Sequence, residues 1–146
     1  MKLTVLCDNN TYIDQYYLGE PALCFYIEDE NRKILLDAGY SSVFKKNAAL
    51  MNLDLNQLTD IVISHGHNDH TRGLKYLLPS LKKEVTLTVH PHAFKPKYVG
   101  DEYIGAPFSK DEISSLVKYR ESIEPVSITS RLIFLGQIPR KTDFEA

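Results

Sequence analysis

The sequence has no tryptophan, only two cysteines, and no apolar run near the length of a membrane span, which needs roughly 18 residues or more. The apolar stretch 3–7 is also too short for a signal peptide. Cys7 and Cys24 each lie in an apolar, strand-like segment, which favours buried free thiols over a disulfide bond or metal ligands. These absences exclude a disulfide-stapled scaffold and make a cytoplasmic protein the natural expectation.

An excess of charge of either sign is also missing. The 17 basic and 19 acidic residues give a net charge of -2, so neither nucleic acid nor an acidic membrane is expected as a partner. The 43% hydrophobic and 25% charged content is typical of a globular protein. Without repeats or linkers, 146 residues suit a single domain over residues 1–146 with one sizeable core.

Short apolar segments between polar turns predict the secondary structure. Strands are expected at residues 3–7, 22–27, 33–37, 61–64, 85–90, 126–128 and 132–135. Helices are expected after Ser41, from Leu74 to Pro79, and at Ser109, where a capping box precedes Ile113, Leu116 and Val117. Segment 96–107 is expected to be an irregular loop. Antiparallel strands followed by strand–helix–strand units indicate a layered α/β or α+β sandwich.

Three of the five histidines and one carboxylate lie within six positions, directly after the apolar run 61–63. In a loop, His65 and His67 can project to the same side, whereas Asp69 and His70 follow where a helix begins and diverge by about 100°. The first two side chains can therefore reach one position in space, and the next two can reach a neighbouring position. Surface histidines and simple helix capping are the alternative, but four ligand-type residues in this register favour a binuclear metal site.

Imidazole and carboxylate ligands suit zinc, with iron or manganese as alternatives. In such a site one ion polarises the scissile bond, and a bridging water becomes a hydroxide nucleophile near neutral pH. Outside the cluster, His90 and His92 flank Pro91, and a structural or substrate-side role is favoured over ligation, with His90 better placed for a pocket. Arg140 is a candidate anion-binding residue, and a solvated charge is the equally weighted alternative.

The stretch His65-Gly66-His67-Asn68-Asp69-His70 resembles the His-x-His-x-Asp-His signature of the metallo-β-lactamase fold superfamily. Segments 5–9, 35–39, 64–70 and 136–140 are similar to the branch of dihydropterin-ribofuranosylaminobenzene-phosphate synthase-like metal-dependent hydrolases. The resemblance implies the N-terminal half of an αββα sandwich.

By that resemblance, His65 and His67 match two ligands of a first metal, and Asp69 and His70 match two ligands of a second. Asp69 also matches a residue that helps orient the nucleophilic water. Asp37 matches an acid that steadies the ligand loop. The oxygen-reducing di-iron branch commonly has Glu at position 67, so His67 favours hydrolysis over redox chemistry.

Full-length members of the superfamily have a second half that supplies a third histidine for the first metal, a bridging acid and a final histidine. In the similar branch the third histidine lies in a Gly-Cys-Ser-His stretch, which these 146 residues do not contain. Catalytic zinc usually keeps three protein ligands. We therefore expect a truncated domain whose uncovered apolar layer leads to a homo-oligomer or to completion by a second polypeptide.

The leading hypothesis is a metal-dependent hydrolase in which metal-bound hydroxide attacks an ester, phosphoester or similar bond of a small-molecule substrate, with phosphorylated compounds among the candidates. The alternative is a catalytically incomplete metal-binding or assembly module that lacks the C-terminal ligands. It predicts metal binding without turnover, so whether this chain is an enzyme stays open. A nucleic-acid processing enzyme of the same fold has little support without a basic patch.

Overall fold

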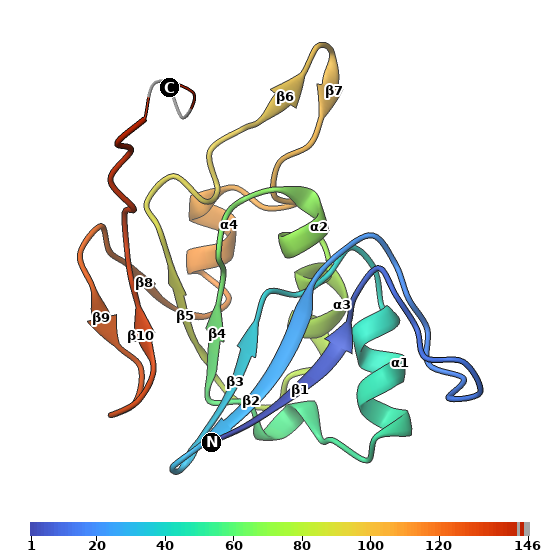
Figure 1. The fold of residues 1–146 in the computed structure, drawn as a ribbon. Coiled ribbons are helices and arrows are strands. Elements are labelled where there is room, and N and C mark those ends of the chain that lie inside the picture. The colour runs from blue at the N-terminus through green and yellow to red at the C-terminus, as the bar shows by residue number, and fades with distance from the viewer. Residues whose placement is uncertain (143, 145–146) are drawn as a thin grey trace.

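A mixed six-stranded sheet forms the centre of the computed structural model, which describes residues 1–142 and 144 (Figure 1). Positions 143, 145 and 146 of the domain expected over 1–146 lie outside this description. The strand order is β1 (Lys2–Cys7), β2 (Cys24–Asp29), β3 (Arg32–Leu36), β4 (Asp60–Val62), β5 (Thr86–Val89) and β8 (Lys118–Glu121). Strands β1 to β3 are antiparallel, whereas β3, β4, β5 and β8 run parallel. The expected mixed α/β class is confirmed.

Helices cover one face of this sheet. They are α1 (Val43–Leu50), α2 (Asn68–Thr71), α3 (Leu74–Leu77) and α4 (Lys110–Ser114), with 3₁₀ turns η1 (Leu55–Gln57) and η2 (Leu78–Ser80). The main core lies beneath them, where Tyr26, Phe44 and Leu87 are fully buried. Cys7 and Cys24 lie in the same core as free thiols. No helix in the described part of the chain has the length and apolarity needed to cross a membrane.

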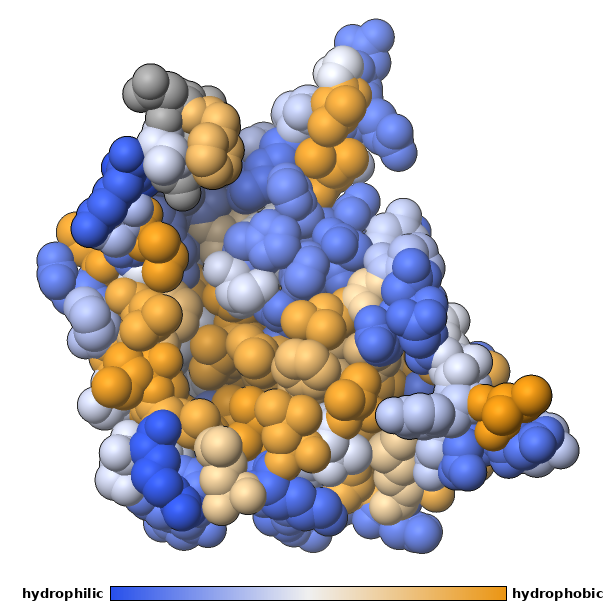
Figure 2. All heavy atoms as spheres, in the orientation of Figure 1, coloured by the Kyte–Doolittle hydropathy of each residue, from blue (hydrophilic) through white to orange (hydrophobic). Residues whose placement is uncertain are grey.

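The opposite face of the sheet carries a second, smaller apolar cluster around Ile27, Ile34 and Val62. A short hairpin of β9 (Val126–Ser127) and β10 (Ile133–Phe134) lies against it. The hairpin does not reach β1, where Leu3 and Val5 remain 51% and 44% exposed. Figure 2 shows this face as a broad apolar area.

Three local predictions differ from the structure. The loop expected over 96–107 contains a projecting hairpin of β6 (Tyr98–Val99) and β7 (Glu102–Tyr103), which turns at Gly100 with φ +58°. Strand β8 was not predicted, because an edge strand with exposed Lys118 lacks the alternation of apolar residues that marks a half-buried strand. The capping box is present, but α4 ends at Ser114 and leaves Leu116 53% exposed.

Candidate metal centre

The candidate ligands lie at the carboxyl end of the parallel strand β4: His65 and His67 on the loop that follows it, and Asp69 and His70 within α2. His67 occupies the N-cap position of α2, and the Thr71 hydroxyl donates to its carbonyl oxygen at 2.7 Å. Gly66 is required by close packing, because a Cβ there would lie 1.7 Å from the carbonyl oxygen of Ala93. A Cβ on Gly73 would lie 1.8 Å from the Ala38 carbonyl oxygen. The chain is therefore packed closely against neighbouring backbone both before and after α2.

The four predicted ligands come together in space. Ligand atoms of His65, Asp69 and His70 all lie within 4.8 Å of one another, and His70 Nε2 is 3.2 Å from Asp69 Oδ2. His67 joins the group through His65, since His67 Nδ1 is 3.1 Å from His65 Nε2. Zinc binds nitrogen and oxygen at about 2.0–2.2 Å, so two of its ligand atoms in a tetrahedral site lie about 3.2 to 3.6 Å apart. The Asp69–His70 spacing fits this requirement.

Asp37 lies beneath the cluster and is fully buried. It follows β3 with φ 57°, a left-handed conformation that is uncommon for a non-glycine residue. Its carboxylate accepts from the Ser64 backbone N–H at 2.8 Å, from the Ser64 hydroxyl at 2.7 Å and from His70 Nδ1 at 2.7 Å. A proton held at Nδ1 leaves the Nε2 lone pair of His70 directed at Asp69, as metal ligation requires.

The two central imidazoles have opposite pKa shifts. The hydrogen bond to Asp37 raises the pKa of His70 above its ordinary value. Burial, followed by the neighbouring His70 and His67, lowers the pKa of His65. His65 Nδ1 lies 3.1 Å from the Ser64 hydroxyl, whose own proton goes to Asp37. One buried carboxylate thus orients His70 directly and His65 through Ser64.

Glu20 is a residue that the sequence reasoning missed. Its carboxylate accepts from the backbone N–H groups of Tyr40 and Ser41 at 2.9 and 3.1 Å and from the Ser41 hydroxyl at 2.5 Å. These bonds hold the turn that follows Asp37. Gly39 is needed there, because a Cβ would lie 2.8 Å from Glu20 Oε1 and φ is +70°. The partners are about 20 positions away, so no local motif could have revealed the contact.

A cavity of about 670 Å³ opens beside His65. The predicted substrate-side residues His90 and Arg140 line it, together with His92 and Lys97. His90 Nδ1 accepts from the His92 backbone N–H at 3.1 Å, so neutral His90 carries its proton on Nε2. That Nε2 is buried and has no partner among the described residues. The site therefore has a hydrogen-bond donor that no described acceptor of the protein satisfies.

A histidine and aspartate cluster over a buried carboxylate, set at the end of a parallel strand, gives this α/β protein a candidate metal centre. Residues 18–140 match the model of the metallo-beta-lactamase superfamily, and the chain belongs to this superfamily.

Two proteins of Methanocaldococcus jannaschii are similar along almost the whole chain. An uncharacterized protein is 32% identical over 98% of this chain and 56% of its own length. A 7,8-dihydropterin-6-methyl-4-(beta-D-ribofuranosyl)-aminobenzene-5'-phosphate synthase is 27% identical over 99% of this chain and 54% of its own length. The crystal structure of Tm1679, a metal-dependent hydrolase of the beta-lactamase superfamily, superposes with a TM-score of 0.75 at 30% identity, covering 92% of this chain and 47% of that one. The chain spans about half the length of the relatives it matches.

Proposed function

We propose that this chain forms the metal-binding part of a hydrolase that cleaves an ester, phosphoester or similar bond in a small anionic substrate. The observation that carries the proposal is the convergence of His65, Asp69 and His70 above the buried Asp37, at the edge of a cavity. Membership of the metallo-beta-lactamase superfamily supports a metal-dependent, hydrolase-like fold.

The donor set fits divalent zinc, with iron or manganese as alternatives, because it combines imidazole nitrogens with one carboxylate. We assign His65 and His67 to one ion, and Asp69 and His70 to a second. A bound ion of this kind polarises the scissile bond and lowers the pKa of a coordinated water toward neutrality.

The protein's own contribution is to orient these groups and to handle a proton. Asp37 fixes the His70 ring, and its side chain is completely shielded from solvent. The Asp69 side chain is 37% exposed, so its carboxylate can contact a water molecule and accept a proton from it. Asp69 is thus the proposed catalytic residue, and Asp37 a positioning residue.

On the cavity side, we assign substrate binding to His90 and Arg140. The unpaired Nε2–H of His90 can donate to an oxygen of the substrate, and a guanidinium group binds phosphate or carboxylate in a two-point contact. The synthase relative is named for a compound that carries a 5'-phosphate. That name supports phosphorylated compounds as first substrates to assay.

A second candidate function is a metal-binding or assembly module without turnover. The apolar sheet face favours it, since Leu3 and Val5 are exposed beside the β9–β10 hairpin. We propose that a further polypeptide layer covers this face, because the matched relatives are about twice as long. Sedimentation of the purified chain across a concentration range tests self-association: a homo-oligomer would identify the layer as a second copy.

Turnover separates the two functions. Purified protein loaded with zinc or manganese is incubated with bis(p-nitrophenyl) phosphate and p-nitrophenyl acetate, beside an Asp69→Ala variant and an Asp101→Ala control at the exposed tip of the β6–β7 hairpin. The hydrolase proposal expects turnover that Asp69→Ala abolishes and Asp101→Ala retains. Metal uptake with no turnover of either ester by the wild-type chain would instead support the module.

A further inference from the structure

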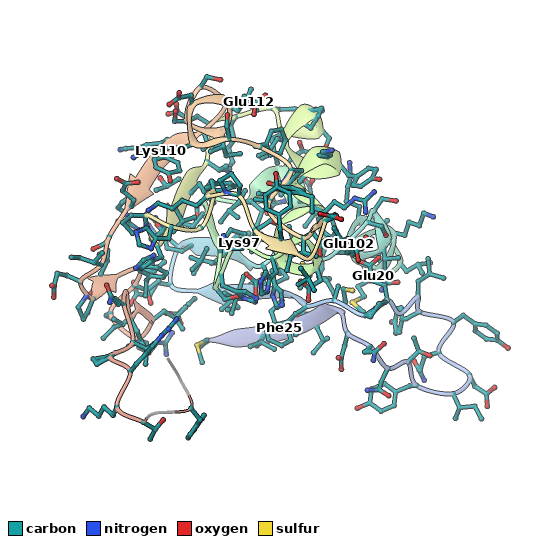
Figure 3. All side chains as sticks on the ribbon, turned by 90° about the horizontal axis from the view of Figure 1, so that it is seen from above. Glu20, Phe25, Lys97, Glu102, Lys110 and Glu112 are labelled. Carbon is teal, nitrogen blue, oxygen red and sulfur yellow. The ribbon has the colours of Figure 1, made fainter. Side chains whose placement is uncertain are left out.

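Lys97 directly precedes β6 and lies near the middle of the molecule seen from above (Figure 3). Its side chain lies between the turn that follows β5 and the loop that carries His65 and His67. Its Nζ donates to the carbonyl oxygens of His92, Ala93 and Lys95 at 3.1, 3.0 and 3.1 Å. A Cβ on Gly66 would lie 2.6 Å from this Nζ. The ammonium group is therefore packed directly against the backbone between His65 and His67.

The geometry requires the charged form of Lys97. Three N–H donors exist only on the protonated amine, and all three have a carbonyl acceptor. Among the ion pairs of residues 1–142 and 144, none includes Lys97. Burial lowers its pKa from the ordinary lysine value, as expected for a cation that no carboxylate compensates. Neutral carbonyls satisfy its hydrogen bonds without cancelling its charge.

The cavity beside the ligands has a matching electrostatic character. Among the residues that the structure describes, its lining includes Lys97 and Arg140 but no aspartate or glutamate, although the whole chain has a net charge of -2. Three histidines, Ser64 and Gln137 supply the other polar side chains of the wall. Such a concentration of one sign of charge in a concave site attracts ligands of the opposite sign.

We propose that Lys97 is a specificity-determining residue of this site: it fixes a positive charge in the cavity wall and selects substrates that carry an anionic group. The inference deepens the proposed function and rests on it. The three N–H groups of Lys97 already donate to backbone carbonyls, so its charge acts on the anion through its electrostatic field. Direct contacts with the anion are left to His90 and Arg140. An unpaired, immobilised cation attracts an anion more strongly than a mobile surface lysine does, because water screens it less.

Inorganic phosphate binding to the metal-free protein tests the inference, with titration followed by NMR of the five histidines. The variants are Lys97→Met, which removes the charge, and Lys97→Arg, which retains it. Lys95→Met is the matched control, since this neighbouring lysine is exposed. We expect about tenfold weaker phosphate binding for Lys97→Met. Lys97→Arg should stay within about threefold of wild type, and Lys95→Met should be unchanged.

Two results would overturn the role of Lys97: a wild-type chain that binds no phosphate, or a Lys97→Met variant that binds it as tightly as wild type. Equal losses of phosphate affinity in Lys97→Met and Lys97→Arg, with equally lowered melting temperatures, would also overturn it. They would show that Lys97 only stabilises the local structure. Metal uptake by the same wild-type sample is measured separately. Failure there would remove the hydrolase proposal while leaving the phosphate result to decide the role of Lys97.

Discussion

The two sides of the candidate site are built differently. On the inner side, Asp37 is fully buried and each of its oxygens accepts at least one hydrogen bond, so the rings above it are fixed before any ligand binds. On the cavity side, His90 keeps a buried donor with no partner in the described part of the chain, and Arg140 lies on an exposed segment. The contrast supports our proposal that the inner side holds a metal ion and the cavity side receives the substrate. Substitutions on the inner side should therefore lower metal affinity, whereas substitutions on the cavity side should weaken substrate binding.

The largest effect is expected for Asp37→Ala. The substitution leaves the Ser64 N–H and hydroxyl and His70 Nδ1 without their acceptor in a buried site, and each lost partner costs about 1–3 kcal/mol. Metal affinity should fall by about 10–100-fold, as is typical when the partner of a ligating histidine is removed. Isothermal titration with zinc and thermal unfolding measure the two effects. Asp101→Ala is the control. Unchanged zinc affinity in Asp37→Ala would contradict the role proposed for the inner side of the site.

Glu20→Ala should have the next largest effect. It removes the acceptor of the turn that follows Asp37, so stability should fall by about 1–2 kcal/mol and metal affinity by a few-fold. Glu20→Gln retains one acceptor oxygen and should recover part of both losses. Denaturant unfolding checks the stability change. A variant with full stability and full metal affinity would show that the turn is held without Glu20.

Arg140→Ala acts on the other side of the comparison. We expect KM for a phosphorylated substrate to rise about tenfold, with metal content and melting temperature unchanged, because the guanidinium group lies on an exposed segment. Steady-state kinetics with charged and neutral p-nitrophenyl esters separates this effect from a loss of kcat. An equal change for both esters would contradict an anion-binding role.

The smallest effect is expected for the pH dependence of the stability of the β9–β10 hairpin, which precedes the segment that carries Arg140. The Thr129 hydroxyl, and then Arg131, lower the pKa of Asp29 below 3.8 by hydrogen bonding to its carboxylate. The stabilisation this provides is present above pH 3.8 and is lost as the pH falls through the lowered pKa. Between pH 5 and 8 the hairpin amides should therefore show constant hydrogen-exchange protection, and an Asp29→Asn variant should lower it throughout. Protection that changes between pH 5 and 8 would point to a different titrating group.

The sequence predicted the parts of this molecule that depend on local signals. The strand before His65, the capping box at Ser109 and the hairpin of β2 and β3 follow from alternation, capping and turn chemistry over a few residues. Contacts over a long separation could not be read in the same way. The donors around Glu20, the surroundings of His90 Nε2 and the carbonyl acceptors of Lys97 depend on how distant loops pack. Strand β8 was missed because its pairing with β5, rather than its own composition, makes it a strand.

The central claim is that the histidine and aspartate cluster binds metal. Equilibrium dialysis of the purified chain against zinc and manganese, followed by elemental analysis, tests it most directly, with His70→Ala as the variant and His92→Ala as the control. We predict at least one bound ion per wild-type chain, the same content in His92→Ala, and a clear loss in His70→Ala, because His70 Nε2 lies 3.2 Å from Asp69 in the ligand group. A wild-type chain that retains no ion, or a His70→Ala variant that retains as much as wild type, would contradict the account.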